Sequence, residues 1–480
     1  ANFGKLGLSK FCLAEPVNQA GYATAFYGKC HLANDDEFHP ARRGYDEAIV
    51  NYGSYRRGYW APKFETEPEV DVPDGTYLGD FLTDKAIDFI RRRKDSSRPF
   101  YVQLNQFLVH GPLEAPKHLI EKYKNKEPDG QDNNPVYAAM IESLDYNVGR
   151  IMKKLEEFGL ADNTVVIFSS DNGGESRNTS NLPLRGGKRY LYEGGIRIPL
   201  IVRWPAVIEP GSITDQPAIG LDMYPTILTL TGAKKPQHHK PVKRDSNTDL
   251  LDQPKEYVLD GADLTELLRS SGKGKLKDHD IFWYFPAYIG PRGGINRDDW
   301  RATPKCAIRS GDYKLIEFFH DDMLELYNLK KDPSENNNLI NAQPDKAAEL
   351  HNKLIRWREQ ISARVPYRKK GSNIGTVFDS KEHNIRTGLC GTSSNGHLAK
   401  LQYCPSYKGL YLYYVVEKSP ADKAGLNPSD IIMKIGDIPI ADADDMQKVF
   451  STYKPPEAVE ITYWRRKKQT TRLKLTAMTD

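Results

Sequence analysis

The sequence predicts an α/β protein in which helices cover both faces of a mixed sheet, followed by a small antiparallel sheet and a separate β/α module. Strand-like runs alternate with amphipathic helical runs over the first 270 residues. Short strand-like runs then follow one another between Ile281 and Leu329. A turn-rich stretch, PYRKKGSNIG, precedes the final module. We therefore expect a core domain at 1–270, a C-terminal subdomain at 271–366, a linker at 367–387 and a last domain at 388–480.

The composition is that of a folded protein with more than one core. A chain of 480 residues exceeds the size at which one hydrophobic core stops growing. Lys and Arg number 68 and Asp and Glu 64, and a surplus of +4 is too small to indicate a nucleic-acid partner. No apolar run approaches the roughly 20 residues that a membrane span needs. The five cysteines have neither metal-ligand spacing nor the density of a disulfide framework.

The elements of the core domain follow from the spacing of apolar residues. YATAFYG is strand-like, LGDFLTDKAIDFIRRRK has helical spacing, and FYVQLNQF, from Phe100 to Phe107, is again strand-like. VYAAMIESLDYNVGRIMKKLEEFGL predicts a helix that ends near Gly159, and the β-branched run TVVIF leads on to Ser169. Because the carboxyl ends of strands line the crevice of a doubly wound sheet, we expect ligands to bind after Ser169.

The second half of the chain predicts a smaller sheet. Beyond Gly232 the sequence is polar and rich in Pro, Lys and Asp up to about Lys255, which indicates an exposed excursion. IFWYF, CAIRSG, YKLIEFF and LELYNL then alternate with turn residues. A helix from Asp345 to about Arg364 follows and is expected to back this sheet.

The segment SSDNGG, from Ser169 to Gly174, carries the clearest chemistry. Asp171 offers a charged oxygen and Asn172 a neutral one at a strand end, which suits a hard cation. An Asn-Gly turn with a helix cap is the alternative, and it would be favoured if the segment stood alone.

The segment LPLRGGK offers cations to an anion. Gly186 and Gly187 allow the backbone to pass close to a ligand, while Arg185 and Lys188 place positive charge nearby. The alternative is a basic, solvent-exposed turn.

Two further segments place titratable groups near strand ends. In GYATAFYGKCHLA, Lys29 and His31 stand two residues apart just after a strand, so they share one face if the backbone is extended. In LVHGPLEAP, His110 ends a strand, a position from which a general acid reaches a crevice. A single His near a strand end is more often structural than catalytic.

These four segments together resemble the formylglycine-dependent sulfatases, a branch of the alkaline phosphatase superfamily. They occur in the family's order, FHPARRGYDE resembles the usual continuation of the second signature, and ELYNLKKDPSENNNL resembles the C-terminal subdomain. The resemblance runs from roughly Leu13 to Val365 and implies an alkaline-phosphatase-like fold.

The resemblance implies a role for each candidate residue. Asp171 and Asn172 would bind a divalent cation, usually calcium. Lys29 and Lys188 would contact sulfate oxygens, His110 would bind sulfate or protonate the leaving group, and His31 would support the nucleophile. The implied substrate is a sulfate ester of a carbohydrate, and the implied location is the periplasm or the cell exterior.

The sequence departs from the family pattern at the nucleophile. Sulfatases have an early strand that ends in paired aspartates and then a Cys or Ser, followed by Pro and Arg, that becomes formylglycine; neither block is present. Cys12 aligns with a helix, so we interpret it as structural, and Cys30 stands where the family has Trp. Tyr284 and Ala287 replace two family histidines. We expect weak metal binding, a compromised sheet and no turnover of sulfate esters by these 480 residues.

The start of the chain gives a separate expectation. ANFGKLGLSKF lacks the apolar core and cleavage site of a signal peptide, and it does not begin with Met. We therefore expect that an upstream segment was removed or left out.

The last module, from about Gly388 to Asp480, resembles the PDZ domains attached to bacterial proteases, most closely between Gly409 and Phe450. Such domains hold an extended peptide, often a C-terminus, by strand addition. Either GTSSNGHLAKL or KGLYL is a candidate for the carboxylate-binding loop, and a packing module without a free ligand is an equal alternative. WRRKK is interpreted as a solvated hairpin tip.

Two functions remain open at this point. One is a sulfatase acting on sulfated carbohydrate, and the other is a non-catalytic protein whose sulfatase-like shell and PDZ module bind partners. A phosphodiesterase or phosphatase of the same superfamily would need two metal ions and more His and Asp ligands, and LRGGK and GKCH argue against it.

Overall fold

The computed structural model describes most of the chain. The described residues are 6–32, 36–52, 58–60, 64, 66, 70–127, 134–240, 256–276, 279–289, 302–319, 323–361, 363, 376–377, 389–393, 410–415, 419–426, 430–440, 443–465 and 467–475. The predicted excursion up to Lys255 lies largely outside them, as do the expected linker, most of GTSSNGHLAKL and the first two residues of KGLYL. The chain divides into two units, the first formed by 1–180 and 197–278 and the second by 181–196 and 279–480.

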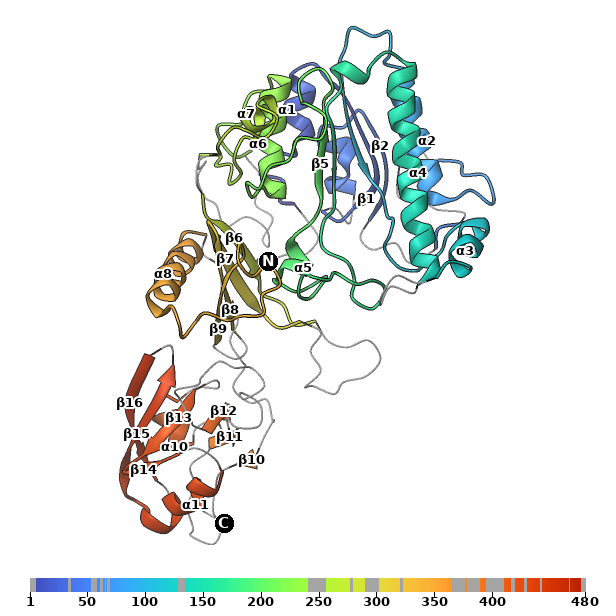
Figure 1. The fold of residues 1–480 in the computed structure, drawn as a ribbon. Helices are drawn as coiled ribbons and strands as arrows, with labels where there is room; N and C mark the ends of the chain where they lie inside the picture. Colours follow the sequence, from blue (N-terminus) through green and yellow to red (C-terminus); the bar gives the residue numbers. More distant parts are fainter. Residues whose placement is uncertain are drawn as a thin grey trace. The chain divides into compact units, whose positions relative to one another are not determined.

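The first unit is built on a parallel sheet in the order β2-β1-β3. β1 is buried on both faces, as expected for a central parallel strand. Ala23, Ala25 and Tyr27 pack with α2, whereas Phe26 on the other face packs with Ala14 of α1. Helices therefore cover both faces of the sheet, as Figure 1 shows. The strands are β1 (Ala23–Cys30), β2 (Glu47–Tyr52) and β3 (Phe100–Asn105).

A second pair of strands completes the first unit. The long helix α4 leads into β4, which pairs antiparallel with β5. The remaining elements of this unit are α1 (Ala14–Gln19), η1 (Asp36–Phe38), η2 (Pro40–Arg42), α2 (Leu78–Arg91), α3 (Lys117–Lys124), α4 (Pro135–Glu157), η3 (Ala161–Asn163), β4 (Val166–Ser169), β5 (Leu200–Arg203), η4 (Gly220–Asp222), α6 (Met223–Thr231) and α7 (Thr265–Arg269).

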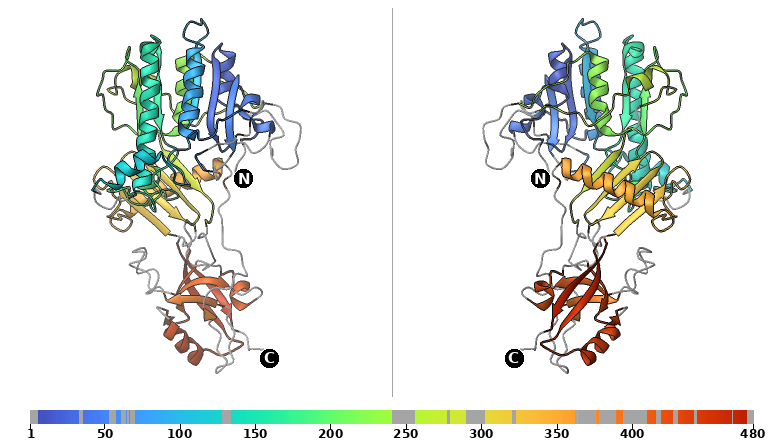
Figure 2. Two further views of the ribbon diagram at one scale, coloured as in Figure 1. Left: turned by 90° about the vertical axis from the view of Figure 1, so that its right-hand side faces the viewer. Right: turned by 90° about the vertical axis from the view of Figure 1, so that its left-hand side faces the viewer.

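The second unit contains the expected antiparallel sheet, in the order β6-β7-β8-β9. Helix α8 lies along this sheet, as Figure 2 shows, and buries Leu350 and Leu354 against it. The Phe282 and Trp357 rings stack with centroids 4.7 Å apart. These elements are α5 (Glu193–Ile196), β6 (Ile281–Phe285), β7 (Lys305–Ser310), β8 (Tyr313–Phe318), β9 (Met323–Asn328) and α8 (Pro344–Gln360).

The C-terminal module has its own sheet and its own buried core. Its strands run in the order β10-β11-β12-β13-β15-β16, with β14 paired to β13. The core draws on Leu412, Ile432, Val449 and Ile461, among others. β15 and β16 pair residue for residue up to Arg465 and Lys467, as expected for a hairpin, while the tip itself lies outside the described residues. The elements are β10 (Thr376–Val377), β11 (Leu389–Ser393), β12 (Leu410–Val415), α10 (Pro420–Lys423), β13 (Ile431–Ile435), β14 (Ile438–Pro439), α11 (Ala443–Thr452), β15 (Ala458–Arg465) and β16 (Lys467–Lys474).

Two element ends differ from the sequence prediction. Lys29 was expected just after a strand but lies within β1, because β1 continues to pair with β2 as far as Cys30. His110 was expected at a strand end, but β3 ends at Asn105 and His110 lies in the turn that follows. No helix among the described residues is both long and apolar enough to cross a membrane.

Candidate functional site

The structure brings Lys29 and Asp171 together at the carboxyl ends of β1 and β4. The Lys29 ammonium lies 3.5 Å from a carboxylate oxygen of Asp171. The Lys29 side chain is 16% exposed and that of Asp171 69%, so the lysine is enclosed while the carboxylate faces solvent. The SSDNGG segment and the GKCH segment therefore meet, although more than a hundred residues separate them.

A close backbone approach fixes the end of β1. Gly28 has φ +109°, and a Cβ added there would lie 2.1 Å from the carbonyl oxygen of Asn105 in β3. Asn105 also donates a hydrogen bond from Nδ2 to the Lys29 carbonyl oxygen at 3.0 Å. Only glycine permits this approach, so Gly28 and Asn105 together determine where the Lys29 side chain begins.

Local hydrogen bonds hold the Asp171 loop. Ser169 donates from Oγ to the Pro199 carbonyl at 3.0 Å, and Ser170 donates to the Asn172 carbonyl at the same distance. Asn172 is half-buried, and its Nδ2 donates to the Gly173 carbonyl at 3.0 Å. This bond uses the amide nitrogen of Asn172, so the side-chain oxygen is the atom that suits a cation.

The described residues do not complete a calcium site. Calcium takes six to eight oxygen ligands, and Asp171 with Asn172 supplies one carboxylate and one amide. Among the residues that the structure describes, no group of three or more His, Cys, Asp and Glu side chains is placed to hold a metal ion. The Asp171 carboxylate faces the Lys29 ammonium instead. We therefore assign no chemical step to a metal ion.

The backbone around His110 is fixed by hydrogen bonds. Its amide donates to the Phe107 carbonyl at 2.7 Å, and the buried Tyr59 hydroxyl lies 2.8 Å from the carbonyl oxygens of both residues. His110 Nδ1 lies 2.7 Å from the Gly111 carbonyl oxygen, which can only accept. Nδ1 therefore carries a hydrogen, and Nε2 is the atom that gains or loses a proton. His31 lies directly after β1 and is exposed.

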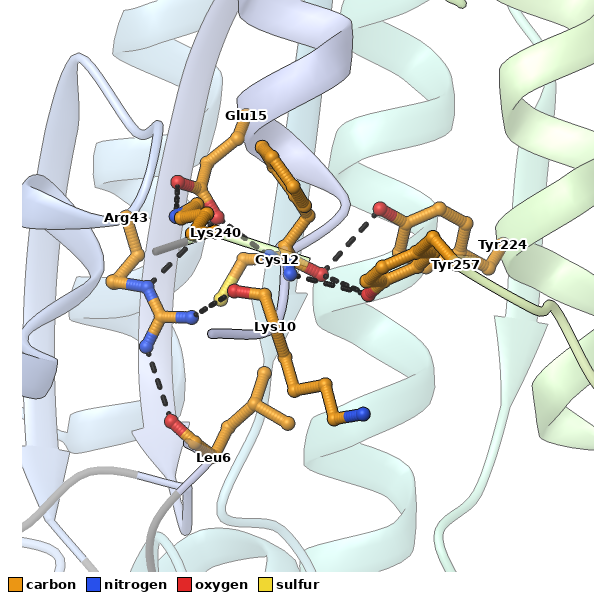
Figure 3. A network of polar contacts seen from close by, with 9 residues as sticks. Leu6, Lys10, Cys12, Glu15, Arg43, Tyr224, Lys240 and Tyr257 are labelled. Atoms are coloured by element: carbon orange, nitrogen blue, oxygen red, sulfur yellow. Dashed lines mark hydrogen bonds and ion pairs between the residues drawn. The ribbon is translucent and has the colours of Figure 1, made fainter. Parts of the chain in front are cut away.

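The surroundings of Cys12, drawn in Figure 3, support the structural interpretation of this residue. Its backbone amide donates to Glu15 at 2.6 Å, and Arg43 donates to the carbonyls of Leu6 and Lys10 at 3.2 and 2.7 Å. Burial raises the pKa of the Cys12 thiol to about 11. A nucleophilic cysteine needs a lowered pKa, so this thiol is held in its unreactive form.

Lys188 belongs to the second unit, in a tight loop. The Gly194 amide donates to the Arg185 carbonyl at 2.8 Å, and the Tyr190 amide donates to the Gly187 carbonyl at 2.9 Å. Lys188 itself is half-buried.

Arg185 makes contacts within the second unit. Its Nη1 donates to the Tyr327 hydroxyl and to the Glu335 carbonyl, both at 3.0 Å. Its guanidinium also lies 4.0 Å from the centroid of the Tyr192 ring. Arg185 therefore anchors the loop to the antiparallel sheet.

Sequence reasoning missed a buried ionic cluster formed by Glu193, Lys314 and Glu335. The Lys314 ammonium lies 2.8 Å from a Glu193 oxygen and 2.7 Å from a Glu335 oxygen. No local pattern could have revealed it, because Glu193 and Lys314 are 121 residues apart. The available signal was Lys314, a charged residue inside the mostly apolar, strand-like run YKLIEFF.

Family models match most of the chain. A sulfatase model matches residues 2–233, a model of the N-sulphoglucosamine sulphohydrolase C-terminal region matches 249–360, and a PDZ model matches 379–475.

Curated relatives include a sulfatase of Formosa agariphila, which is 34% identical over 61% of this chain and 54% of its own length. Human steryl-sulfatase is 31% identical over 56% of this chain and 45% of its own length. An uncharacterized sulfatase of Schizosaccharomyces pombe is 25% identical over 78% of this chain and 81% of its own length. The chain thus spans about half the length of the first and second of these relatives.

Solved structures share the fold. Ps i-CgsB, determined with a neocarrahexaose, has a TM-score of 0.60 at 22% identity and covers 74% of this chain and 78% of its own. BT4656, determined with its substrate D-glucosamine-2-N,6-O-disulfate, has a TM-score of 0.58 at 22% identity and covers 76% and 85%. At this level of identity the likeness confirms the predicted fold class.

Proposed function

Because this chain belongs to the sulfatase family and carries a PDZ domain, we propose that it supplies the sulfate-binding part of a sulfuric ester hydrolase that acts on sulfated carbohydrate. The observation that carries the proposal is the meeting of Lys29 with the Asp171 loop at the strand ends. An enclosed ammonium at the end of a strand stabilises charge on the oxygens of a bound anion.

Each candidate residue has a proposed part in binding. Lys29 and Lys188 contact sulfate oxygens, and His110 passes a proton from Nε2 to the leaving oxygen while Gly111 fixes its ring. His31 supports the nucleophile. Asp171 and Asn172 are two of the ligands of a calcium ion whose other ligands are not among the described residues.

The nucleophile of the family is a formylglycine, and no Cys or Ser in residues 1–480 lies in a Cys/Ser-x-Pro-x-Arg motif. Hydrolysis is therefore proposed for the complete catalytic assembly. Binding of the sulfated ligand is proposed for the chain as it stands.

The substrate class rests on names of similar proteins. Several relatives at 28–29% identity are N-acetylgalactosamine-6-sulfatases, and BT4656 was determined with a sulfated glucosamine. Steryl-sulfatase is also a relative, so a sulfated sterol is the substrate to be tested against the sugar. For the PDZ domain we propose an extended peptide ligand, and for the whole protein a periplasmic or secreted location.

Calorimetric titration with a 6-sulfated amino sugar and its unsulfated parent, with calcium present, tests binding. We expect the chain to bind the sulfated sugar but not its unsulfated parent. Lys29→Met should weaken this binding by about tenfold, which corresponds to the loss of one charged contact of about 1.4 kcal/mol. Lys153→Met removes the same charge from the exposed face of α4 and is the control. Equal binding of both sugars, or equal effects of the two substitutions, would refute the proposal.

A gain-of-function experiment tests hydrolysis. The chain alone should not release sulfate from an aryl sulfate. Joining a segment that carries a Cys-x-Pro-x-Arg motif to residue 1, with formylglycine formation verified by mass spectrometry, should create turnover that replacing the Cys of this motif by Ala abolishes. A folded, modified and sulfate-binding chimaera without turnover would favour the non-catalytic alternative.

A further inference from the structure

The second unit contains an ionic cluster that is closed to solvent. Lys314, in β8, is 0% exposed, and its two partners Glu193 and Glu335 have side chains 3% and 0% exposed. Glu193 begins α5, directly after the loop that contains Lys188, and Glu335 lies in the turn segment after β9. One lysine therefore joins three segments that are distant in the sequence.

Stability alone does not explain this cluster. Two carboxyl groups face one ammonium, so one lysine cannot neutralise both of them when they are ionised. Burial raises the pKa of Glu335 against the opposing effect of Lys314. Buried ion pairs are often no more stable than apolar residues of the same size. What such a cluster does provide is a fixed geometry, because each group must keep its partners.

The geometry that it fixes is that of the Lys188 loop. The second oxygen of Glu335 accepts the backbone amide of Glu193 at 2.6 Å, at one end of the loop. The Glu335 carbonyl accepts a hydrogen bond from Arg185 at 3.0 Å, at the other end. Glu335 therefore holds both ends of the loop, and Lys314 holds Glu335.

The loop between these anchors has little room to adjust. A Cβ added at Gly194 would lie 2.5 Å from the Gly186 carbonyl oxygen, and one at Gly195 would lie 2.2 Å from that of Tyr190. The backbone is packed against itself on both sides of Lys188. A displacement of Glu193 is therefore passed on to Lys188, since the loop cannot absorb it.

We propose that Lys314 and Glu335 are positioning residues for anion binding, holding the loop from Arg185 to Glu193 so that Lys188 presents its ammonium to the sulfate group. The inference rests on the proposed function of Lys188. Neither Lys314 nor Glu335 touches the ligand, and both act through the loop.

The first measurement is of the loop itself. In the full chain, Lys314→Met should increase amide hydrogen exchange in peptides covering residues 185–195 by about tenfold or more, because the anchored amides open more often. Lys353→Met is the control, because it removes a lysine of α8 whose ion pair is with Asp280. Exchange that is unchanged in Lys314→Met would overturn the anchoring.

The second measurement is a double-mutant cycle on binding of the 6-sulfated amino sugar. Lys188→Met and Lys314→Met should each weaken binding by about tenfold, and the double variant should be no weaker than Lys188→Met, because Lys314 acts only through Lys188. Independent, additive losses would overturn the proposal, since a merely structural lysine would not depend on Lys188.

Two further outcomes keep the proposals distinguishable. If the unsubstituted chain does not prefer the sulfated sugar, the proposed function fails, and the positioning role for anion binding fails with it. If it does prefer the sulfated sugar and Lys314→Met binds as tightly, only the positioning role fails. Should Lys314→Met not fold, Glu335→Gln keeps the side-chain shape and must show the same loss of binding through Lys188.

Discussion

The close approach at Gly28 allows a quantitative test of how β1 presents Lys29. Substituting Gly28 by Ala places a methyl group 2.1 Å from the Asn105 carbonyl oxygen, whereas ordinary contact begins at 3.4 Å. To reach ordinary contact, the two atoms must therefore move apart by 3.4 minus 2.1, or 1.3 Å. That separation acts on the hydrogen bond from Asn105 to the Lys29 carbonyl.

The cost follows from three contributions. A positive φ costs an alanine about 1–2 kcal/mol, the collision costs about 1–3 kcal/mol, and the weakened hydrogen bond costs about 1 kcal/mol. We expect a total of about 4 kcal/mol. Because domains are stable by only about 5–15 kcal/mol, this is a large loss, but it need not unfold the unit.

Gly21→Ala is the matched control. Gly21 has φ +94° and would have nothing within 4 Å of an added Cβ, so only the conformational cost of about 1–2 kcal/mol applies. Urea titration followed by hydrogen exchange in peptides covering β1 and β3 measures both variants in the first unit. Gly28→Ala should also lose binding of the sulfated sugar, and Gly21→Ala should keep it. Equal destabilisation of the two variants would refute the reasoning.

Three further predictions concern titratable groups. Burial raises the pKa of the Cys12 thiol to about 11. The thiol should therefore react with iodoacetamide at pH 8 about a hundredfold more slowly in the folded chain than in urea, as measured by mass spectrometry. Rapid alkylation of the folded chain would contradict the structural interpretation. Burial acts to raise the pKa of Glu317, but hydrogen bonds and charge from His351 and Arg358 outweigh it and lower this pKa. The stability that the Glu317 carboxylate contributes is therefore present above the ordinary pKa of 4.5 and is lost as the pH falls below that value. Glu317→Gln should flatten the decline in urea midpoint from pH 5 to pH 3, and parallel declines would count against this. Asp171→Ala should change the free energy of unfolding by less than about 1 kcal/mol, because the Asp171 side chain is 69% exposed; a larger shift of the urea midpoint would show a structural role instead.

Local sequence patterns predicted helices and strands of the fold and the segments that carry the candidate site residues. The helical spacing before Gly159 and the β-branched run before Ser169 depend on nearby residues alone, and both elements are present. The likeness of Lys29 and Asp171 to sulfatase motifs also put them at strand ends, where they meet.

The ends of the strands and the partners of distant residues could not be predicted from the local sequence. β1 runs on to Cys30 because Tyr52 of β2 pairs with it there, and β3 ends at Asn105, opposite Gly28. Such limits are set by the partner strand and not by the segment's own residues. Lys314 reads as part of an apolar strand run, and only the folded chain shows that Glu193 and Glu335 surround it.

The three-stranded sheet of the first unit also affects how the protein will behave in solution. Within the described part of the chain, β3 pairs with β1 alone, so its other side offers backbone amides and carbonyls in register for a further strand. Leu200 and Ile201 of β5 are 38% and 61% exposed, which adds apolar surface. Unpaired strand borders of this kind attract other chains. Purified samples should therefore associate increasingly as their concentration rises, and titrations are best made in dilute solution.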